Sequence, residues 1–487
     1  MLSTELKVLI QKIQLRQCEE QTLEVKAAHL GCPEKLYDTY SSFANQADGG
    51  TLVFGLDEQH DFVKVGVYDP QDLQKKLMEV GEEMTPIVRP VLSVYDEDGL
   101  VFVSAEIPPV DLAERPCFKT SKGRLKGSYI RVGDGDKPMT EYEVYSYEAF
   151  RKQYRDDIRP IANASLDGLN QPQIEAYLLL RKQNRPNLAT IPTQQLYELT
   201  SIMHEGQITM MALLLFGPYP QAYFPQLSII ATRVPGTEMG ILNSAGQRFL
   251  DSKRIEGNLP EMLESAMAFL RTNMRTGFRI DPKTGNREDI PEYPLDALRE
   301  SVLNALVHRD YSIHTENMPI QLTMYADRVE IKNPGGLYGR LTVDQLGQAQ
   351  PDTRNPFLVT AMEAIGQTEN RYSGIPRIRH AMEEANLPQP VFTDNRSEFT
   401  VCLYNKQQTG PFSEFAVVPN EANALLKFCV VPRTRQEIAD FLGIRAVQYA
   451  MKRYVEPLIA QGDIILSIPD HPRSRNQTYQ TRLYTDA

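Results

Sequence analysis

The first 150 residues combine one helical period with several short alternating runs. Leucine and isoleucine recur every three or four positions over residues 2–13, which predicts a helix with one buried face. Short apolar runs bounded by turn residues then predict strands. The expected strands cover residues 22–27, 51–56, 101–107 and 128–132. This order predicts an α+β domain over residues 1–150.

The pattern changes twice in the middle of the chain. Residues 151–290 indicate helices interrupted by prolines, which we interpret as a helical or α+β connector. A second strong helical period covers residues 294–308, and alternating strands follow at 321–325 and 328–332. This sandwich-like pattern predicts a separate α/β domain over residues 291–408.

The C-terminal residues predict a small helical domain. Three short helical periods precede an apolar run, which is the element order of a winged helix-turn-helix. These segments are residues 420–428, 434–442, 446–460 and 463–468. The predicted domain covers residues 414–487, so the whole chain is expected to be an α+β multidomain protein.

Composition narrows the class of protein. The 487 residues are 41% hydrophobic and 24% charged, and no apolar run reaches the roughly 18 residues of a membrane span. We therefore expect no membrane association and a cytoplasmic location. Five scattered cysteines encode neither a disulfide framework nor a zinc site. Because the net charge is −11, any contact with nucleic acid must come from local basic patches.

The helix at 294–308 carries the strongest chemical signal. Glu300, Asn304 and His308 are spaced four apart, so they share one helix face, while leucine and valine occupy another. A carboxylate can orient and deprotonate a water, and an amide oxygen one turn later can hold Mg²⁺ beside a phosphate. The alternative is that these are solvent-facing residues of an ordinary helix.

This helix resembles the N-box of the GHKL ATPases, in the divergent branch that accompanies Schlafen-type domains. The resemblance implies ATP as cofactor, Glu300 as the water-activating base and Asn304 as the Mg²⁺ ligand. Residues 331–337, with the sequence Ile-Lys-Asn-Pro-Gly-Gly-Leu, resemble the first glycine motif, and residues 354–356 and 372–375 resemble the lid and phosphate loop. The implied nucleotide contacts are Asn304, His308, Asn333, Gly335, Gly336, Arg354, Asn355 and Gly374.

Two departures from the GHKL pattern bear on activity. Asn333 stands where the family has an adenine-contacting aspartate, and Gly374 is a single glycine where a longer glycine-rich run is usual. Nucleotide binding is therefore better supported than rapid hydrolysis. The Pro-Gly-Gly sequence could alternatively be a plain turn.

Residues 19–26 and 43–57, with the run Phe-Ala-Asn, Gly-Gly and Gly-Leu-Asp, resemble the AlbA-like core of Schlafen proteins. The resemblance implies that Glu19, Glu24 and Asp57 hold Mg²⁺ or Mn²⁺ for phosphodiester cleavage. Many prokaryotic members of this family are described as DNA-binding regulators. Since Glu24 could also be an ordinary strand residue, we favour a non-catalytic domain over a nuclease.

Two groups of cations are candidates for nucleic-acid contact. The first lies near Phe118 and Tyr129 and comprises Lys119, Lys122, Arg124, Lys126 and Arg131. The second is the predicted recognition helix of the winged helix, with Arg445, Gln448, Lys452 and Arg453. The first group could instead be a solvated loop, and winged helices also bind proteins.

These observations lead to one expected function and two alternatives. We expect an ATP-binding regulatory protein, a transcriptional regulator, whose nucleotide state controls engagement of DNA or RNA through homo-oligomerisation. The main alternative is an ATP-gated, metal-dependent nuclease, for example in defence against foreign genetic elements. A weaker alternative is an ATPase whose end domains bind only protein.

Overall fold

The computed structural model describes most of the chain, in two compact units, Met1–Asn405 and Lys406–Ala487. The described residues are 1–280, 286–350, 352–367, 373–405, 425, 428–441, 451, 455, 458–459, 464–467 and 477–481. Helices and sheets are mixed throughout, which confirms the predicted α+β multidomain class. None of the helices in these residues is long and apolar enough to span a membrane.

The N-terminal part of the first unit is built on a four-stranded sheet in the order β1-β2-β7-β6. β1 runs parallel to β2, and the other pairs are antiparallel. The strands are β1 (Leu23–Lys26), β2 (Gly50–Phe54), β6 (Val91–Glu97) and β7 (Leu100–Ile107). The covering helices are α1 (Ser3–Arg16), α2 (Tyr37–Ala44) and α3 (Pro70–Glu82).

Alternation along β2 explains how helices cover both faces of this sheet. Leu52 and Phe54 pack in one hydrophobic cluster with α2 and α3, whereas Val53 packs in another cluster with α1. Successive side chains of a strand point to opposite faces, so a short apolar run is buried on both sides. The helix predicted over residues 2–13 is therefore the cover of the second face.

Smaller elements complete this region and lead out of it. They are β3 (Leu56–Asp57), β4 (Val63–Lys64), β5 (Met84–Thr85), β8 (Phe118–Lys119), α4 (Gly123–Gly127), β9 (Tyr129–Val132) and β10 (Gly135–Pro138). Helix α5 (Glu141–Arg151) follows directly and begins at Thr140, whose hydroxyl accepts from the backbone of Glu143. The Glu143 side chain accepts in return from the backbone of Thr140, which forms a capping box.

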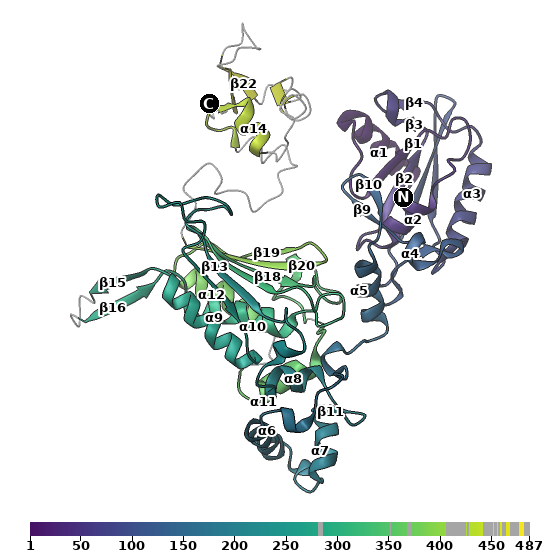
Figure 1. The fold of residues 1–487 in the computed structure, drawn as a ribbon. Coiled ribbons are helices and arrows are strands. Elements are labelled where there is room, and N and C mark those ends of the chain that lie inside the picture. The colour runs from purple at the N-terminus through teal and green to yellow at the C-terminus, as the bar shows by residue number, and fades with distance from the viewer. Residues whose placement is uncertain are drawn as a thin grey trace. The chain divides into compact units, whose positions relative to one another are not determined.

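The rest of the first unit is organised by a six-stranded sheet in the order β14-β13-β17-β18-β20-β19. Its strands are β13 (Ile229–Arg233), β14 (Asp251–Ile255), β17 (Ile320–Met324), β18 (Arg328–Pro334), β19 (Val391–Asp394) and β20 (Glu398–Tyr404). α9 (Leu259–Asn273), α10 (Leu295–His308) and α12 (Gly374–Glu384) lie against one face of this sheet (Figure 1).

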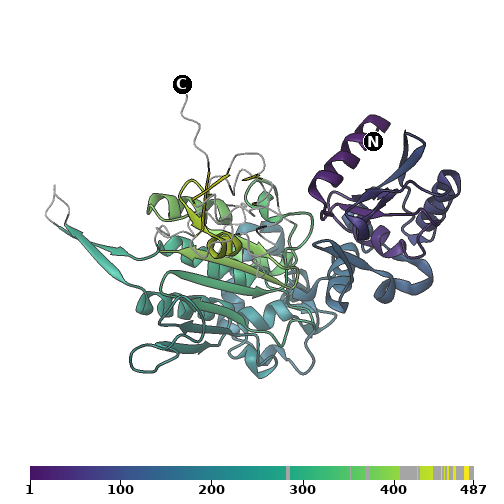
Figure 2. The ribbon, with the colours of Figure 1, turned by 90° about the horizontal axis from the view of Figure 1, so that it is seen from above.

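The remaining elements surround this sheet. They are α6 (Gln171–Asn184), α7 (Thr193–Leu199), β11 (Met203–His204), β12 (Gln207–Ile208), α8 (Met210–Phe216), α11 (Pro356–Ala364) and the hairpin of β15 (Thr276–Ile280) with β16 (Arg287–Pro291). The hairpin extends away from the sheet and helices (Figure 2). α8 is buried along its whole length.

The boundary expected at residue 290 lies inside one folded body. β13 pairs in parallel with β17, and a single hydrophobic cluster extends from Ile161 to Leu403. The expectation of an independent connector fails here because parallel pairing joins strands that are far apart in sequence, which periodicity cannot reveal.

The C-terminal unit is described only in part. β21 (Arg433–Thr434), β22 (Ile464–Leu466) and β23 (Thr478–Thr481) form a three-stranded antiparallel sheet beside α14 (Arg435–Phe441). Ile438, Phe441 and Tyr479 belong to its hydrophobic cluster. The predicted recognition-helix residues Arg445, Gln448, Lys452 and Arg453 lie outside the described residues, so the winged helix stays a prediction.

The packing of α10 generates a stability prediction. Leu298 is 0% exposed and Leu295 is 36% exposed on the same helix. We expect Leu298→Ala to lower the unfolding free energy of this unit by about 2–4 kcal/mol, because it leaves a cavity. Leu295→Ala should cost less than about 1 kcal/mol. Urea denaturation followed by circular dichroism measures both, and equal shifts would contradict this packing.

Candidate nucleotide site

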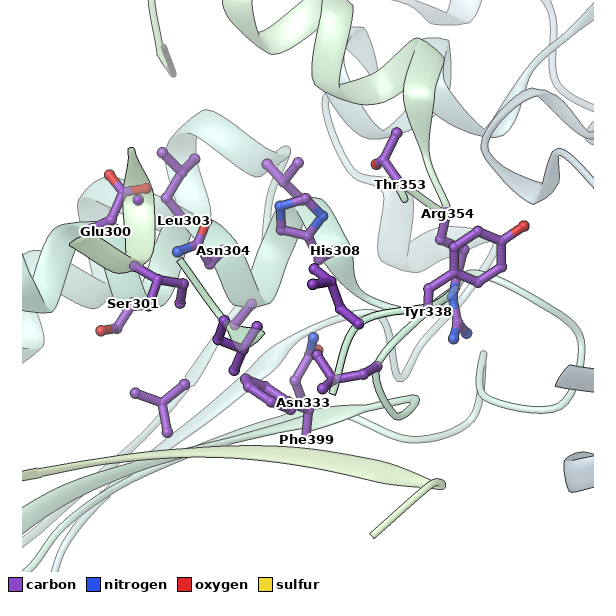
Figure 3. Close-up of a pocket in the computed structure, with 18 of the residues that line it drawn as sticks. Glu300, Ser301, Leu303, Asn304, His308, Asn333, Tyr338, Thr353, Arg354 and Phe399 are labelled. Atoms are coloured by element: carbon purple, nitrogen blue, oxygen red, sulfur yellow. The ribbon is translucent and has the colours of Figure 1, made fainter. Parts of the chain in front are cut away.

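The candidate residues of α10 and the glycine turn line a single cavity of about 240 Å³. Figure 3 shows Glu300, Asn304 and His308 following one another along α10, with Asn333 below His308. The apolar part of the lining includes Leu303, Val307, Ile331, Phe399 and Val401. An apolar cavity with a few convergent polar groups is typical of small-molecule sites.

The polar face of α10 is more buried than its sequence indicates. Glu300 is only 9% exposed and Asn304 is half-buried. His308 is accessible from the cavity, yet burial within the protein, together with the nearby Arg354, lowers its pKa to about 4. The imidazole is therefore neutral near pH 7 and offers one donor and one acceptor.

The beginning of α12 closes one end of the cavity. A methyl group at Gly374 would lie 2.5 Å from Glu300 Oε1 and 3.2 Å from Asn304 Nδ2, so glycine allows the backbone to approach both side chains. The first N–H groups of a helix have no acceptor within that helix, and the helix dipole favours negative charge beside them. This end of the cavity is therefore suited to an anion.

The glycine turn closes the opposite end. Gly335 has φ +96°, and a Cβ there would lie 2.6 Å from Asp310 Cβ. The backbone N–H groups of Gly335 and Gly336 donate to the carbonyls of Ser397 (2.8 Å) and Arg396 (3.2 Å). Only glycine combines this conformation with so close a packing.

Asn333 is placed in the cavity by the register of β18. Val329, Ile331 and Asn333 alternate along the strand and are all buried on the face toward the helices. Asn333 lines the cavity, is 5% exposed, and its Oδ1 has no hydrogen-bond partner among the described residues. A buried acceptor without a partner is costly, so a ligand N–H here would stabilise the site.

Arg354 and Asn355 have different positions although they are adjacent in sequence. Arg354 lines the cavity, forms an ion pair with Asp310, and donates to the Gly336 carbonyl at 3.3 Å. Asn355 is fully buried and donates to the carbonyls of Val307 (2.9 Å) and Arg309 (2.7 Å). Asn355 therefore holds the end of α10 and is not part of the cavity lining.

Two of the three candidate N-terminal carboxylates, Glu19 and Glu24, lie beside a buried arginine, and Asp57 does not. Arg131 is 1% exposed and pairs with Glu19 at 3.6 Å, Glu24 at 2.6 Å and Asp136 at 3.2 Å. Asp57 accepts from the backbone of Gln59 at 3.1 Å and contacts His60 at 2.8 Å. Among the described residues, no group of three or more carboxylate, histidine or cysteine side chains is arranged to hold a metal. The cations beside these acids are the guanidinium of Arg131 and the ammonium of Lys26, which forms an ion pair with Glu24.

Four of the five expected basic residues are at or near the surface. Lys119 and Lys122 lie over the Tyr37 ring, 4.8 and 4.2 Å from its centroid. Arg124 pairs with Glu148, and Lys126 is exposed. Lys119 lies on β8, Arg124 and Lys126 lie on α4, and Arg131 lies on β9. Arg131 is buried with the acids, so its expected place among the nucleic-acid-contacting cations is wrong.

Known family models match two regions of the chain. Residues 19–140 match the family model described as "Schlafen, AlbA_2". Residues 317–403 match HATPase_c_4, described as "Putative ATP-dependent DNA helicase recG C-terminal". This chain combines a Schlafen AlbA_2 domain with a HATPase_c_4 domain. The AlbA_2 match contains all three candidate carboxylates, whereas the HATPase_c_4 match contains Asn333 and Gly374 but begins after α10.

Two solved structures resemble the chain more distantly. The DIP2311 protein from Corynebacterium diphtheriae is 18% identical, covers 92% of this chain and 93% of its own, and has a TM-score of 0.39. The N-terminal domain of a RecG-related protein from Nitrosomonas europaea is 23% identical, covers 29% of this chain and 94% of its own, and has a TM-score of 0.23. No curated protein matches the chain.

The sequence patterns missed three residues beside the HATPase_c_4 cavity. Tyr338 lines the cavity and follows Gly336 by two positions. This proximity to the glycine motif could have identified it from the sequence. Asp310 is 1% exposed beneath the turn, and its acidic side chain in a buried stretch was a weaker signal. Tyr142 contacts Asp310 from a distant segment, and no local pattern indicates it.

The buried group of Arg131 with Glu19, Glu24 and Asp136 generates a pH prediction. Burial, opposed by the backbone N–H of Val25, raises the pKa of Glu19 to about 8. The folded state therefore holds a proton that the unfolded state releases above its own pKa near 4.5. The stabilising contribution of Glu19 is therefore fully present below its unfolded pKa and is lost as pH rises from about 5 to about 8.

We expect Glu19→Gln, which is permanently neutral, to be more stable than the wild type at pH 8 by about 1 kcal/mol or more, and similar at pH 5. Thermal unfolding at both pH values measures the difference. A variant that is equally destabilised at both pH values would contradict the raised pKa.

Proposed function

We propose that this chain binds ATP in the cavity of its HATPase_c_4 body and that bound nucleotide controls how the protein engages nucleic acid. The observation that carries the proposal is the convergence, in one cavity, of Glu300 and Asn304 with the glycine turn and the start of α12. These groups come from three segments of the chain, and together they offer both a phosphate end and a base end.

The phosphates lie at the α12 end in this proposal. Gly374 allows the helix backbone to approach Glu300 and Asn304, and the backbone N–H groups of Gly374 and Ile375 suit phosphate oxygens. Pro376 has no N–H, and the N–H of Arg377 donates to the Ser373 carbonyl. Mg²⁺ usually takes one or two protein oxygens and completes its octahedron with phosphates and water. Asn304 fits that need through its amide oxygen, and the Mg²⁺ would neutralise charge on the phosphates.

Glu300 is the group that orients and deprotonates an attacking water in this arrangement. It lies beside Gly374 at the α12 end of the cavity, and at 9% exposure it is largely away from bulk solvent. Turnover is expected to be slow, because the phosphate end has one glycine and not a glycine-rich loop.

The base lies at the Asn333 end. Oδ1 of Asn333 needs an N–H donor, and the exocyclic amine of adenine supplies one. The neutral His308 stands beside it on α10, and apolar side chains such as Phe399 and Val401 provide surfaces for the purine.

Nucleic-acid engagement is proposed for the AlbA_2 domain through Lys119, Lys122, Arg124 and Lys126. These cations are concentrated in one short segment of a chain with net charge −11, so local phosphate contacts are favoured over general binding. A regulatory role follows if nucleotide changes this engagement, and homo-oligomerisation is the expected route. The C-terminal unit is proposed to contribute through a winged helix.

The nucleotide site is tested by titrating the full chain with a fluorescent ATP analogue. Asn304→Ala should weaken binding by about tenfold, because it removes the metal contact. Chelating Mg²⁺ with EDTA should weaken the wild type by a similar factor and change Asn304→Ala little. Asp296→Ala is the matched control, since Asp296 is exposed on the same helix and outside the cavity lining. Unchanged affinity in Asn304→Ala would remove the assigned site.

The nuclease alternative rests on Glu19 and Glu24 being close together around Arg131. We expect no cleavage of labelled RNA or DNA with Mn²⁺, because the buried guanidinium of Arg131 already lies beside these acids and disfavours a second cation. Gel analysis of wild type and Glu24→Gln measures this. Cutting by the wild type that is lost in Glu24→Gln would establish the nuclease instead.

A further inference from the structure

Helix α5 contacts two groups that hold the glycine turn in place, namely the Asp310–Arg354 ion pair and Arg396. Tyr142 donates to Asp310 Oδ2 at 2.7 Å and accepts from Arg354 Nη1 at 3.5 Å. On the same helix, Glu143 pairs at 3.6 Å with Arg396, whose backbone carbonyl accepts from Gly336. The turn that closes the cavity is therefore held by residues that α5 touches from outside.

A third contact reaches the cavity lining itself. The ring of Phe150, near the end of α5, packs edge-on against Tyr338 with 5.5 Å between centroids. Tyr338 lines the cavity, and Arg354 lies over its ring at 5.2 Å. α5 thus meets the cavity wall at both its first and last turns.

The other side of α5 belongs to the AlbA_2 domain. Val144 and Tyr147 pack with Ile130 and Met139 of the β9–β10 region. Glu148 forms an ion pair with Arg124 of α4, one of the cations proposed to meet nucleic acid. One helix of eleven residues therefore joins the glycine turn to the basic segment.

We propose that α5 transmits nucleotide occupancy of the cavity to the basic segment, with Tyr142 as the positioning residue that links the helix to Arg354 and Asp310. This regulation rests on the proposed ATP site. A ligand that contacts the glycine turn and Arg354 restricts the motion of Arg354 and Arg396, which Tyr142 and Glu143 contact. The resulting change in the position or mobility of α5 alters the strength of the ion pair between Glu148 and Arg124.

The coupling is required to be reciprocal. If nucleotide alters the affinity of the basic segment for phosphate, phosphate at that segment alters the affinity for nucleotide by the same factor. Tyr142→Phe removes one hydroxyl and keeps the ring, so it loosens the link without emptying the packing between α5 and the cavity wall.

Hydrogen–deuterium exchange of the full chain tests the proposal, with and without Mg²⁺ and the slowly hydrolysed analogue AMP-PNP. In the wild type, exchange should slow in three segments, residues 300–308, residues 141–151 and residues 120–127. In Tyr142→Phe, slowing should persist at 300–308, while the effect at 141–151 and 120–127 should fall by about tenfold.

Two variants separate transmission from loss of structure. Tyr147→Phe removes a hydroxyl from the same helix on its AlbA_2 side and should behave as the wild type. Arg396→Gln removes the ion pair with Glu143 but keeps the carbonyl that holds Gly336, and it should weaken transmission as Tyr142→Phe does. Should Tyr142→Phe disturb folding, Arg396→Gln carries the test, because Arg396 is 41% exposed.

The outcomes distinguish the two claims. Slowing at 300–308 with no change at 141–151 in the wild type would overturn transmission and leave the ATP site standing. No slowing at any of the three segments would overturn the ATP site itself. Equal effects of Tyr142→Phe and Tyr147→Phe would overturn the specific role of Tyr142.

Discussion

The buried ion pair between Asp310 and Arg354 is the interaction on which the candidate site depends. Asp310 is 1% exposed and Arg354 is 7% exposed. Although burial works to raise the pKa of Asp310, Arg354 and the Tyr142 hydroxyl lower it, so the carboxylate stays ionised. Removing one partner of such a pair typically costs about 3–5 kcal/mol, since the other charge is left buried and unpaired.

The glycine turn takes its shape from this pair. Gly335 packs on the Cβ of Asp310, and the Gly336 carbonyl accepts from Arg354. The glycine turn lines one end of the cavity, and the start of α12 lines the other end. α10 spans the distance between them with Glu300, Asn304 and His308 on its cavity face. In the proposed site, the phosphates lie at the α12 end and the base lies at the glycine-turn end.

The grouping of the α10 residues with the glycine turn was predictable from sequence, and the pairing of distant segments was not. The four-residue spacing of Glu300, Asn304 and His308 and the order of Asn-Pro-Gly-Gly are properties of short segments, and they come together in one cavity. Asn355 was misplaced because adjacent residues of an irregular segment can face opposite ways. Arg131 was misplaced because sequence proximity to four other cations says nothing about the acids that surround it.

The contacts between segments far apart in sequence could not be predicted from the sequence pattern. β13 joins β17 in parallel across the intervening helices, so the body begins well before residue 291. Tyr142 meets Asp310 across 168 positions of sequence, and neither residue lies in a recognisable motif with the other. These contacts arise from tertiary packing, to which hydrophobic periodicity is blind.

A crystal structure of the chain grown with AMP-PNP and Mn²⁺ would locate the nucleotide within the cavity. We expect the purine amine beside Asn333, the phosphates over the first turn of α12, and an anomalous manganese peak next to Asn304. An empty cavity with nucleotide bound elsewhere, or phosphates at the Asn333 end, would contradict this expectation.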